Sequence, residues 1–158
     1  VKNLFYRLKL PLGSDMKYVQ KLVKLSSRPI ALVDDGTSDS ALRRLLFDAG
    51  DDLEDLFILN KADITTKNSS KQAKFKKNFE DVAVKIKEVE EKDQIRNFQP
   101  PISGEEIMAL FGLNPGREIG ILKEKVKEAI LEGEIGNDKE QAREFVIKEG
   151  KLLGLILV

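Results

Sequence analysis

The sequence predicts an all-α fold, with a multi-helix body followed by a small helical tail. Apolar residues recur at spacings of three and four over most of the chain, as they do along one face of an α-helix. Capping residues and glycines bound these stretches, where helices begin and end. Residues 30–33 and the final few residues are the only β-like runs, so we expect no strand hairpin.

The first two predicted helices are set by a cap and a turn. Ser14 is expected to cap a helix over 15–24, and residues 29–33 to form a short apolar link. Asp-Asp-Gly at 34–36 predicts a turn before a second helix over about 38–49.

A glycine and a capping pair separate this helix from the next. Gly50 is expected to end the helix in a left-handed conformation. Asp51 followed by Glu54 has the spacing of a capping box and predicts a new helix that runs to about residue 64.

The longest predicted helix covers about residues 68–98. Its apolar stripe follows spacings of four, three, four and three, the pattern of a heptad repeat, and consists of Phe75, Phe79, Val82, Ile86 and Val89. Two heptads are too few for an isolated coiled coil, so we expect this stripe to lie on other helices. The water-facing side of the same helix is predicted to carry Lys71, Lys74, Lys85 and Glu88.

Two adjacent prolines end the long helix and mark the predicted domain boundary. The residue before a proline disfavours helical geometry, so Pro100 and Pro101 separate two parts. We predict a helical body at 1–97 and a smaller tail at 98–158.

The tail is predicted to hold three helices, near 104–111, 115–132 and 138–150. Ser103 and Glu106 form a capping box before the first of them. Asn114 is expected to cap the second, with Pro115 at its first helical position. The apolar final residues, 152–158, are expected to pack into the core.

Composition excludes several kinds of site. The 158 residues include no cysteine and no histidine, which removes disulfides, thiolate and imidazole nucleophiles, and the commonest zinc ligands. The acidic pairs at 34–35 and 51–52 belong to turns and caps, and Asp63 to a helix end, so no catalytic residue, metal site or cofactor is predicted here. No apolar run approaches the roughly 20 residues of a membrane span and no signal peptide is evident, so we expect a cytoplasmic protein without membrane contact.

The charge is arranged in blocks although the net charge is zero. Residues 1–30 carry seven Lys or Arg against one Asp, whereas residues 31–66 carry three against nine acidic residues. Residues 67–96 have a net charge of +3 and residues 97–158 a net charge of −3. Local fields, and not the overall charge, therefore decide which partners the chain attracts.

One candidate RNA contact is the basic start of the long helix. Five lysines follow one another without an acidic residue between them, and these are Lys67, Lys71, Lys74, Lys76 and Lys77. Such a patch attracts the phosphates of a nucleic acid whatever its base sequence, and residues 68–70 add hydrogen-bond donors. The alternative is an ordinary solvated helix face.

A second candidate is the turn between the first two tail helices. Asn114, Gly116, Arg117 and Lys123 could meet one phosphate, because a helix start offers free backbone N–H groups. The interleaved glutamates predict a small local contact and not a broad basic surface. The alternative is that the glycines only allow helices to pack closely.

Two neighbouring arginines are expected to serve structure. Asp39 lies four residues before Arg43, and Asp48 four residues after Arg44. This spacing predicts ion pairs within one helix.

Ordered motifs along most of the chain resemble one enzyme family. In the tail these are I-S-G-E-E-I-M (102–108), G-L-N-P-G-R-E-I-G (112–120) and L-E-G-E-I (131–135). In the body they are F-Y-R-L-K-L-P (5–11), R-P-I-A-L (28–32), D-S-A-L-R-R-L-L (39–46) and L-F-I-L-N-K-A-D-I-T-T-K-N (56–68). Their order resembles the carboxy-terminal body and tail of bacterial CCA-adding tRNA nucleotidyltransferases, in the poly(A) polymerase head-domain superfamily.

The resemblance implies a role in holding tRNA. A parent enzyme of this family would add CMP and AMP to the tRNA 3′ end, with Mg²⁺, CTP and ATP held by a head domain that this chain lacks. The chain begins at Val1 inside an apolar-periodic stretch without a cap, which indicates a piece of a longer protein. Two alternatives stay open: a helical protein-interaction module that uses the Phe75–Val89 stripe, and a parent that adds only C, only A or a poly(A) tail.

Overall fold

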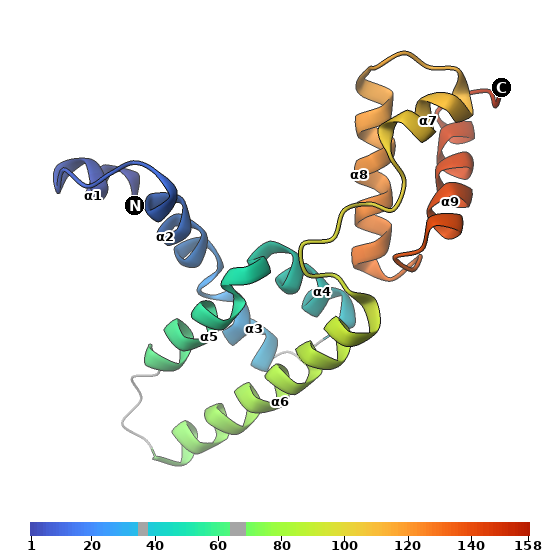
Figure 1. Cartoon of the computed structure of the whole chain (residues 1–158). Coiled ribbons are helices and arrows are strands. Elements are labelled where there is room, and N and C mark those ends of the chain that lie inside the picture. The colour runs from blue at the N-terminus through green and yellow to red at the C-terminus, as the bar shows by residue number, and fades with distance from the viewer. Residues whose placement is uncertain (35–37, 64–68) are drawn as a thin grey trace.

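A computed structural model describes residues 1–34, 38–63 and 69–158, except that no side chain is described at 33, 34, 69, 71, 72, 74 and 75. Its regular elements are all helical, which confirms the predicted all-α class. Figure 1 shows an elongated molecule in which α1 and α2 form an amino-terminal arm, α3 to α6 a central body, and α7 to α9 a carboxy-terminal group. The predicted turn at 34–36 lies largely outside the described residues.

The amino-terminal arm consists of α1 (Lys2–Arg7) and α2 (Ser14–Leu25), joined by a hydrogen-bonded turn and a short loop. The predicted cap at Ser14 is wrong by one position. Gly13 is the N-cap, and the Ser14 hydroxyl bonds to Asp15 inside the helix. None of the residues of α1 is buried.

The predicted apolar link at 29–33 is wrong, because these residues belong to helix α3 (Arg28–Asp34). Pro29 is tolerated because it lies in the first turn, where its missing N–H would have had no helical partner. The Ala31 N–H donates to the Ser27 carbonyl at 3.1 Å and closes that turn.

Helix α4 (Asp39–Ala49) begins and ends near its predicted limits. The Ser38 hydroxyl accepts a bond from the Ala41 N–H. Gly50 ends the helix as predicted, but its conformation is not the expected left-handed one, because its φ of 51° is combined with a ψ of −130°. The single turn η1 (Gly50–Asp52) then leads into α5 (Leu53–Ala62).

The predicted capping box at Asp51 and Glu54 is wrong. Asp52 is the N-cap of α5, and no side-chain bond caps this helix. Asp51 instead accepts a bond from Asn97 at 2.7 Å, and Glu54 pairs with Arg96. Both carboxylates fasten the start of α5 to the segment that follows α6.

Helix α6 (Ser69–Asp93) is the longest element, as predicted, but it ends before residue 98. Gln94 and Asn97 have positive φ angles of 49° and 57°, and the chain turns back here so that Ile95 and Phe98 are buried.

Within the part of the apolar stripe of α6 that the structure describes, all residues are buried: Phe79, Val82, Ile86 and Val89. They lie against α3 and α4, so this part of the stripe is not a free surface for a partner helix. Lys85 and Glu88 face water as predicted, whereas the side chains of Lys71 and Lys74 lie outside the described set.

The carboxy-terminal group contains α7 (Gly104–Phe111), α8 (Arg117–Glu132) and α9 (Lys139–Leu152), close to the predicted ranges. The capping box at Ser103 and Glu106 is confirmed in both directions. The predicted cap at Asn114 is wrong, because Gly116 is the N-cap of α8 and Pro115 precedes it.

One connected apolar cluster, running from Leu25 to Val146, joins the buried residues of the body to those of the carboxy-terminal helices. Helices α4 and α8 meet within it. The division of the chain between residues 97 and 98 stays a prediction. The expected packing of the final residues is confirmed only at Leu155, which is half-buried against the cluster, whereas Leu152, Ile156 and Val158 are 72%, 82% and 93% exposed.

Candidate nucleic-acid interface

The basic patch at the start of α6 is described only in part. Lys67 lies outside the described residues, and Lys71 and Lys74 are described by their backbone alone, within α6. Lys77 is exposed, as is its neighbour Lys76. Both lysines belong to the first half of α6, and Figure 1 shows that this helix begins at its end farthest from the carboxy-terminal helices.

The turn before α8 presents its predicted residues unevenly. Asn114, Gly116 and Arg117 are exposed, and Arg117 is the first residue of the helix. Lys123 is half-buried and lies six positions later, about 120° around the helix from Arg117. These two cations therefore do not share a face.

Glu118 occupies part of the space at this helix start. A Cβ placed on Gly116 would meet the Glu118 Oε2 atom at 3.0 Å. A phosphate that approached the first N–H groups of α8 would meet this carboxylate. Gly116 has a φ of −166°, an extended conformation that other residues also adopt, so its backbone does not require glycine.

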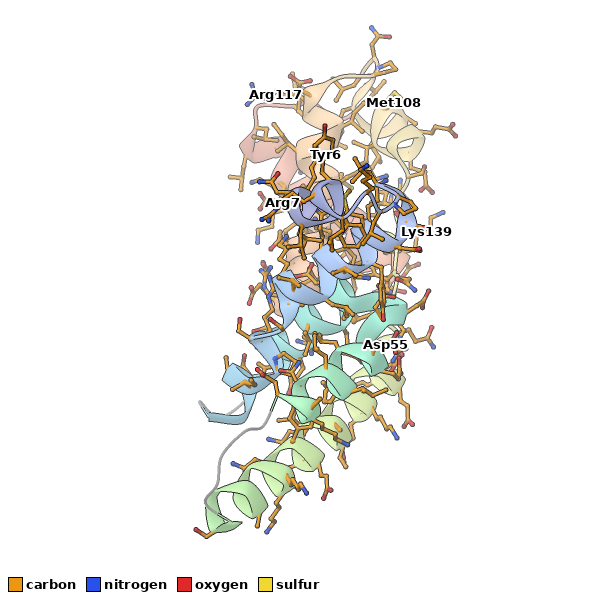
Figure 2. The ribbon with its side chains drawn as sticks, turned by 90° about the vertical axis from the view of Figure 1, so that its left-hand side faces the viewer. Tyr6, Arg7, Asp55, Met108, Arg117 and Lys139 are labelled. Atoms are coloured by element: carbon orange, nitrogen blue, oxygen red, sulfur yellow. The ribbon has the colours of Figure 1, made fainter. Side chains whose placement is uncertain are left out.

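The two candidate contacts lie at opposite ends of the molecule, as Figures 1 and 2 show in perpendicular views. They cannot bind one phosphate together. An extended polyanion is the kind of ligand that could reach both, because its charge is distributed along its length.

The amino-terminal arm adds a cationic surface that was not among the predicted sites. Tyr6 is 76% exposed, and its neighbour Arg7 is exposed as well (Figure 2). Other exposed lysines of the arm are Lys2, Lys9, Lys17 and Lys24. The excess of positive charge in residues 1–30 was the sequence signal that could have identified this surface.

The two arginines of α4 serve structure, as predicted, but their expected partners are wrong. Arg43 Nε bonds to Asp93 at the end of α6, at 2.7 Å. Its guanidinium also lies against the turn after α8, where a Cβ on Gly133 would come within 2.6 Å of Arg43 Nη1. Asp48, the other expected partner in α4, pairs with Arg28.

Arg44 connects α4 to α8. Its Nη2 atom lies 2.6 Å from Glu128 and 2.5 Å from Glu132, both on α8. The hydrogen bond from Arg44 holds the pKa of the Glu132 carboxyl below its usual value. Both arginines are therefore engaged within the chain and are poor candidates for contacts with RNA.

No cluster of three or more metal-ligating side chains occurs within residues 1–34, 38–63 and 69–158. Over the same described part of the chain, no helix is both long and apolar enough to cross a bilayer.

Comparisons with known proteins give two relatives. One is a CC-adding tRNA nucleotidyltransferase of Thermus thermophilus, 38% identical over 108 residues, which are 68% of this chain and 23% of that protein. The other is an A-adding tRNA nucleotidyltransferase of Deinococcus radiodurans, 32% identical over 144 residues, which are 91% of this chain and 32% of that protein. The chain is similar to tRNA nucleotidyltransferases.

This similarity agrees with the resemblance to tRNA nucleotidyltransferases that the sequence motifs indicated, whereas the placement in the carboxy-terminal part of such an enzyme stays a prediction. The chain spans about a quarter to a third of the length of these tRNA nucleotidyltransferases. No family model and no solved structure matches it.

Proposed function

We propose that this chain is the tRNA-binding, carboxy-terminal portion of a tRNA nucleotidyltransferase. The observation that carries the proposal is the similarity to two enzymes whose names state that they add nucleotides to tRNA, one of them matched over 91% of the chain. The ordered motifs in both body and tail support the same reading.

We place the catalytic centre in a part of the longer protein that this chain does not contain. That part would hold Mg²⁺ together with CTP and ATP and would transfer CMP or AMP to the 3′ end of tRNA. The chain itself would not polymerise nucleotides, and it would act in the cytoplasm, where tRNA is processed.

Nucleotide choice is also placed outside this chain. The two matched stretches, of 108 and 144 residues, must overlap because the chain has only 158 residues. Some of the same residues therefore resemble both a CC-adding and an A-adding enzyme. A parent that adds CCA, only C, only A or a poly(A) tail is compatible with this segment.

The shape of the chain suits a holding role. Helix α6 has 25 residues, a length of about 38 Å at 1.5 Å per residue. Exposed cations lie in three places, which are the first half of α6, the amino-terminal arm and the turn before α8. A rigid helical frame that spaces such contacts could grip the body of a tRNA while its distant 3′ end reacts.

The direct test is tRNA binding by the isolated chain. Fluorescence anisotropy with labelled tRNA that lacks its terminal CCA would give the Kd at several salt concentrations. Three to five phosphate contacts predict a log–log salt slope of roughly −3 to −5. Absence of binding at about 50 mM salt, together with a stable homodimer in sedimentation, would favour a protein-interaction module instead.

A further inference from the structure

The first part of the amino-terminal arm presents large apolar side chains to water. Between residues 4 and 12 the exposed ones are Leu4, Tyr6, Leu8, Leu10 and Leu12. Single exposed apolar residues are ordinary on protein surfaces, but a continuous group of them marks a site of interaction. The arm therefore has the composition of a docking segment.

Helix α1 lacks the packing that normally supports a short helix. It has only six residues, and helices shorter than about 12–15 residues are marginal in water without tertiary contacts. Leu4 and Leu8 are four positions apart and share one face, and they are 57% and 61% exposed. The cations Arg7 and Lys9 lie beside them in the sequence, so apolar and positive groups occur together.

A groove with complementary properties lies between α8 and α9. Its volume is about 470 Å³, and its apolar lining residues are Ile121 and Ala129 of α8 and Phe145 of α9. Phe145 is only half-buried, so part of its ring can take a contact from outside. We call this hollow the acidic groove because of its other lining residues.

Glutamates dominate the polar lining of the acidic groove. They are Glu124, Glu128, Glu132, Glu134 and Glu149. Lys125 also lines it and pairs with Glu149. Arg44 and Lys127 pair with three of the other glutamates, but the local charge remains negative when these cations are included. A basic segment with leucines matches both the charge and the apolar lining.

Two other hollows of the described structure do not offer this match. The one between α5 and α6 is lined by three cationic side chains and two glutamates. The one between α7 and α9 is lined by two cationic side chains and one glutamate. Both have apolar lining residues, so the sign of the charge distinguishes the acidic groove from them.

We propose that the amino-terminal arm of one copy of this chain docks in the acidic groove of a second copy. The arm does not reach the groove of its own chain, because Figure 1 shows the arm and the carboxy-terminal helices projecting from different sides of the central body. Leu4 and Leu8 contact the apolar lining of the groove, and Arg7 and Lys9 face its glutamates. Complementary charge of this kind selects the partner and fixes the register of an interface.

A dimer with two-fold symmetry is the smallest assembly in which every arm and every groove is occupied. Sedimentation velocity of the 158-residue chain at about 50 mM salt should show it, at concentrations up to about 0.1 mM. The association should weaken as salt is added, since exposed charges are screened. A monomer over the whole concentration range would overturn the proposal.

A charge swap tests which surfaces meet. Arg7→Glu with Lys9→Glu reverses the arm, and Glu124→Lys with Glu134→Lys reverses two exposed residues of the groove. Each double variant alone places like charges opposite one another and should weaken self-association at least about tenfold. An equal mixture of the two should associate again, because both contacts of the mixed dimer are then complementary. A mixture that associates no better than either variant alone would overturn the proposal.

A matched control keeps the charge change and moves it elsewhere. Glu88→Lys with Glu91→Lys reverses two exposed glutamates of α6, which lie outside the acidic groove. The Kd of self-association should stay unchanged. A loss as large as that of the groove variant would mean that the association follows overall charge, and the assignment of the groove would be wrong.

The apolar part of the contact is tested with the charges intact. Leu4→Ser with Leu8→Ser should weaken association at least about tenfold, because both side chains become buried in the complex. The melting temperature of the monomer should not fall, since both are exposed there. An unchanged Kd would exclude this face of α1 from the interface. All of these measurements contain no RNA, so their failure leaves the proposed tRNA-binding function untouched.

Discussion

Gly150 of α9 lies directly against the ring of Phe111 at the end of α7. A Cβ placed on Gly150 would come within 2.2 Å of Phe111 Cζ, and both residues are buried. The sequence shows a glycine inside a helical stretch, which by itself lowers helix propensity. The structure supplies the reason, because only a residue without a side chain allows α7 and α9 to meet here.

Gly150→Ala should therefore destabilise the chain. The added methyl group must displace the Phe111 ring or separate two helices, and such overpacking costs about 1–3 kcal/mol. Urea unfolding monitored by circular dichroism measures this loss directly.

Gly120→Ala is the matched control for this glycine. Gly120 also lies inside a helix, but a Cβ there would meet nothing within 4 Å. Alanine should stabilise this exposed position by about 0.5–1 kcal/mol, because it restricts the unfolded chain and favours the helix. Equal effects at positions 120 and 150 would contradict the proposed contact with Phe111.

Arg43 should matter more for stability than its neighbour Arg44. The side chains of Arg43 and Asp93 are 11% and 19% exposed, whereas that of Arg44 is 39% exposed. Arg43→Met would leave Asp93 largely enclosed without its partner, at a cost of about 1–3 kcal/mol. Arg44→Met should cost less than about 1 kcal/mol, as for other exposed ion pairs.

A double-mutant cycle with Asp93→Asn would isolate the Arg43 interaction from the loss of packing. The coupling between Arg43 and Asp93 should exceed that between Arg44 and Glu132. If the two couplings are equal within about 0.3 kcal/mol, the difference in burial does not decide the contribution of these pairs.

Glu106 should make stability fall in acid. The bonds from Lys139 and from the Ser103 backbone N–H hold the pKa of this carboxyl at about 2, against a usual value of 4.5. A lowered pKa in the folded state stabilises the fold above about pH 4.5, and this contribution disappears as the pH falls from about 4.5 to about 2. The urea midpoints of the wild type and of Glu106→Gln should therefore differ at pH 6 and converge near pH 2.

Glu105→Gln is the control for the acid titration. Glu105 is exposed in the same first turn but lies outside the capping box. Its variant should follow the wild-type pH dependence. A Glu106→Gln profile parallel to that of the wild type over pH 2–6 would show that the capping box does not couple to pH.

Features that depend on near neighbours in the sequence were predicted well. The capping box at Ser103, the helix stop at Gly50 and the spacing of the buried residues Phe79 to Val89 all rest on groups within one or two helical turns. Asp51 and Asn114 show the limit of the same reasoning. Their residue types allow a cap, but Asp51 is bonded to Asn97, and α8 begins after Gly116.

Contacts between distant segments could not be predicted. Arg43 has an acidic residue at a suitable spacing within its own helix, yet its partner is 50 positions away, and the partners of Arg44 are 84 and 88 positions away. The sequence offers acidic residues both within α4 and on distant helices. Only the packing of α4 on α6 and α8 decides which of them pair with these arginines.

The proposed RNA contacts lead to a comparison of three charge reversals. Lys71→Glu with Lys74→Glu changes the start of α6, Arg117→Glu the start of α8, and Arg7→Glu with Lys9→Glu the amino-terminal arm. Each lost phosphate contact should weaken binding to tRNAs of any sequence. It should also reduce the magnitude of the log–log slope of affinity against salt by about 1. At about 0.1 M salt we expect the double reversals to raise the Kd roughly tenfold or more, and Arg117→Glu to raise it less, because Glu118 already lies beside that helix start.

Far-ultraviolet circular dichroism should show unchanged helicity in all three variants. Lys148→Glu on α9 changes an exposed lysine outside the three candidate surfaces and serves as the control. If it weakens binding as much as the reversals do, the chain attracts tRNA through its overall charge, and the assignment of separate contacts is wrong.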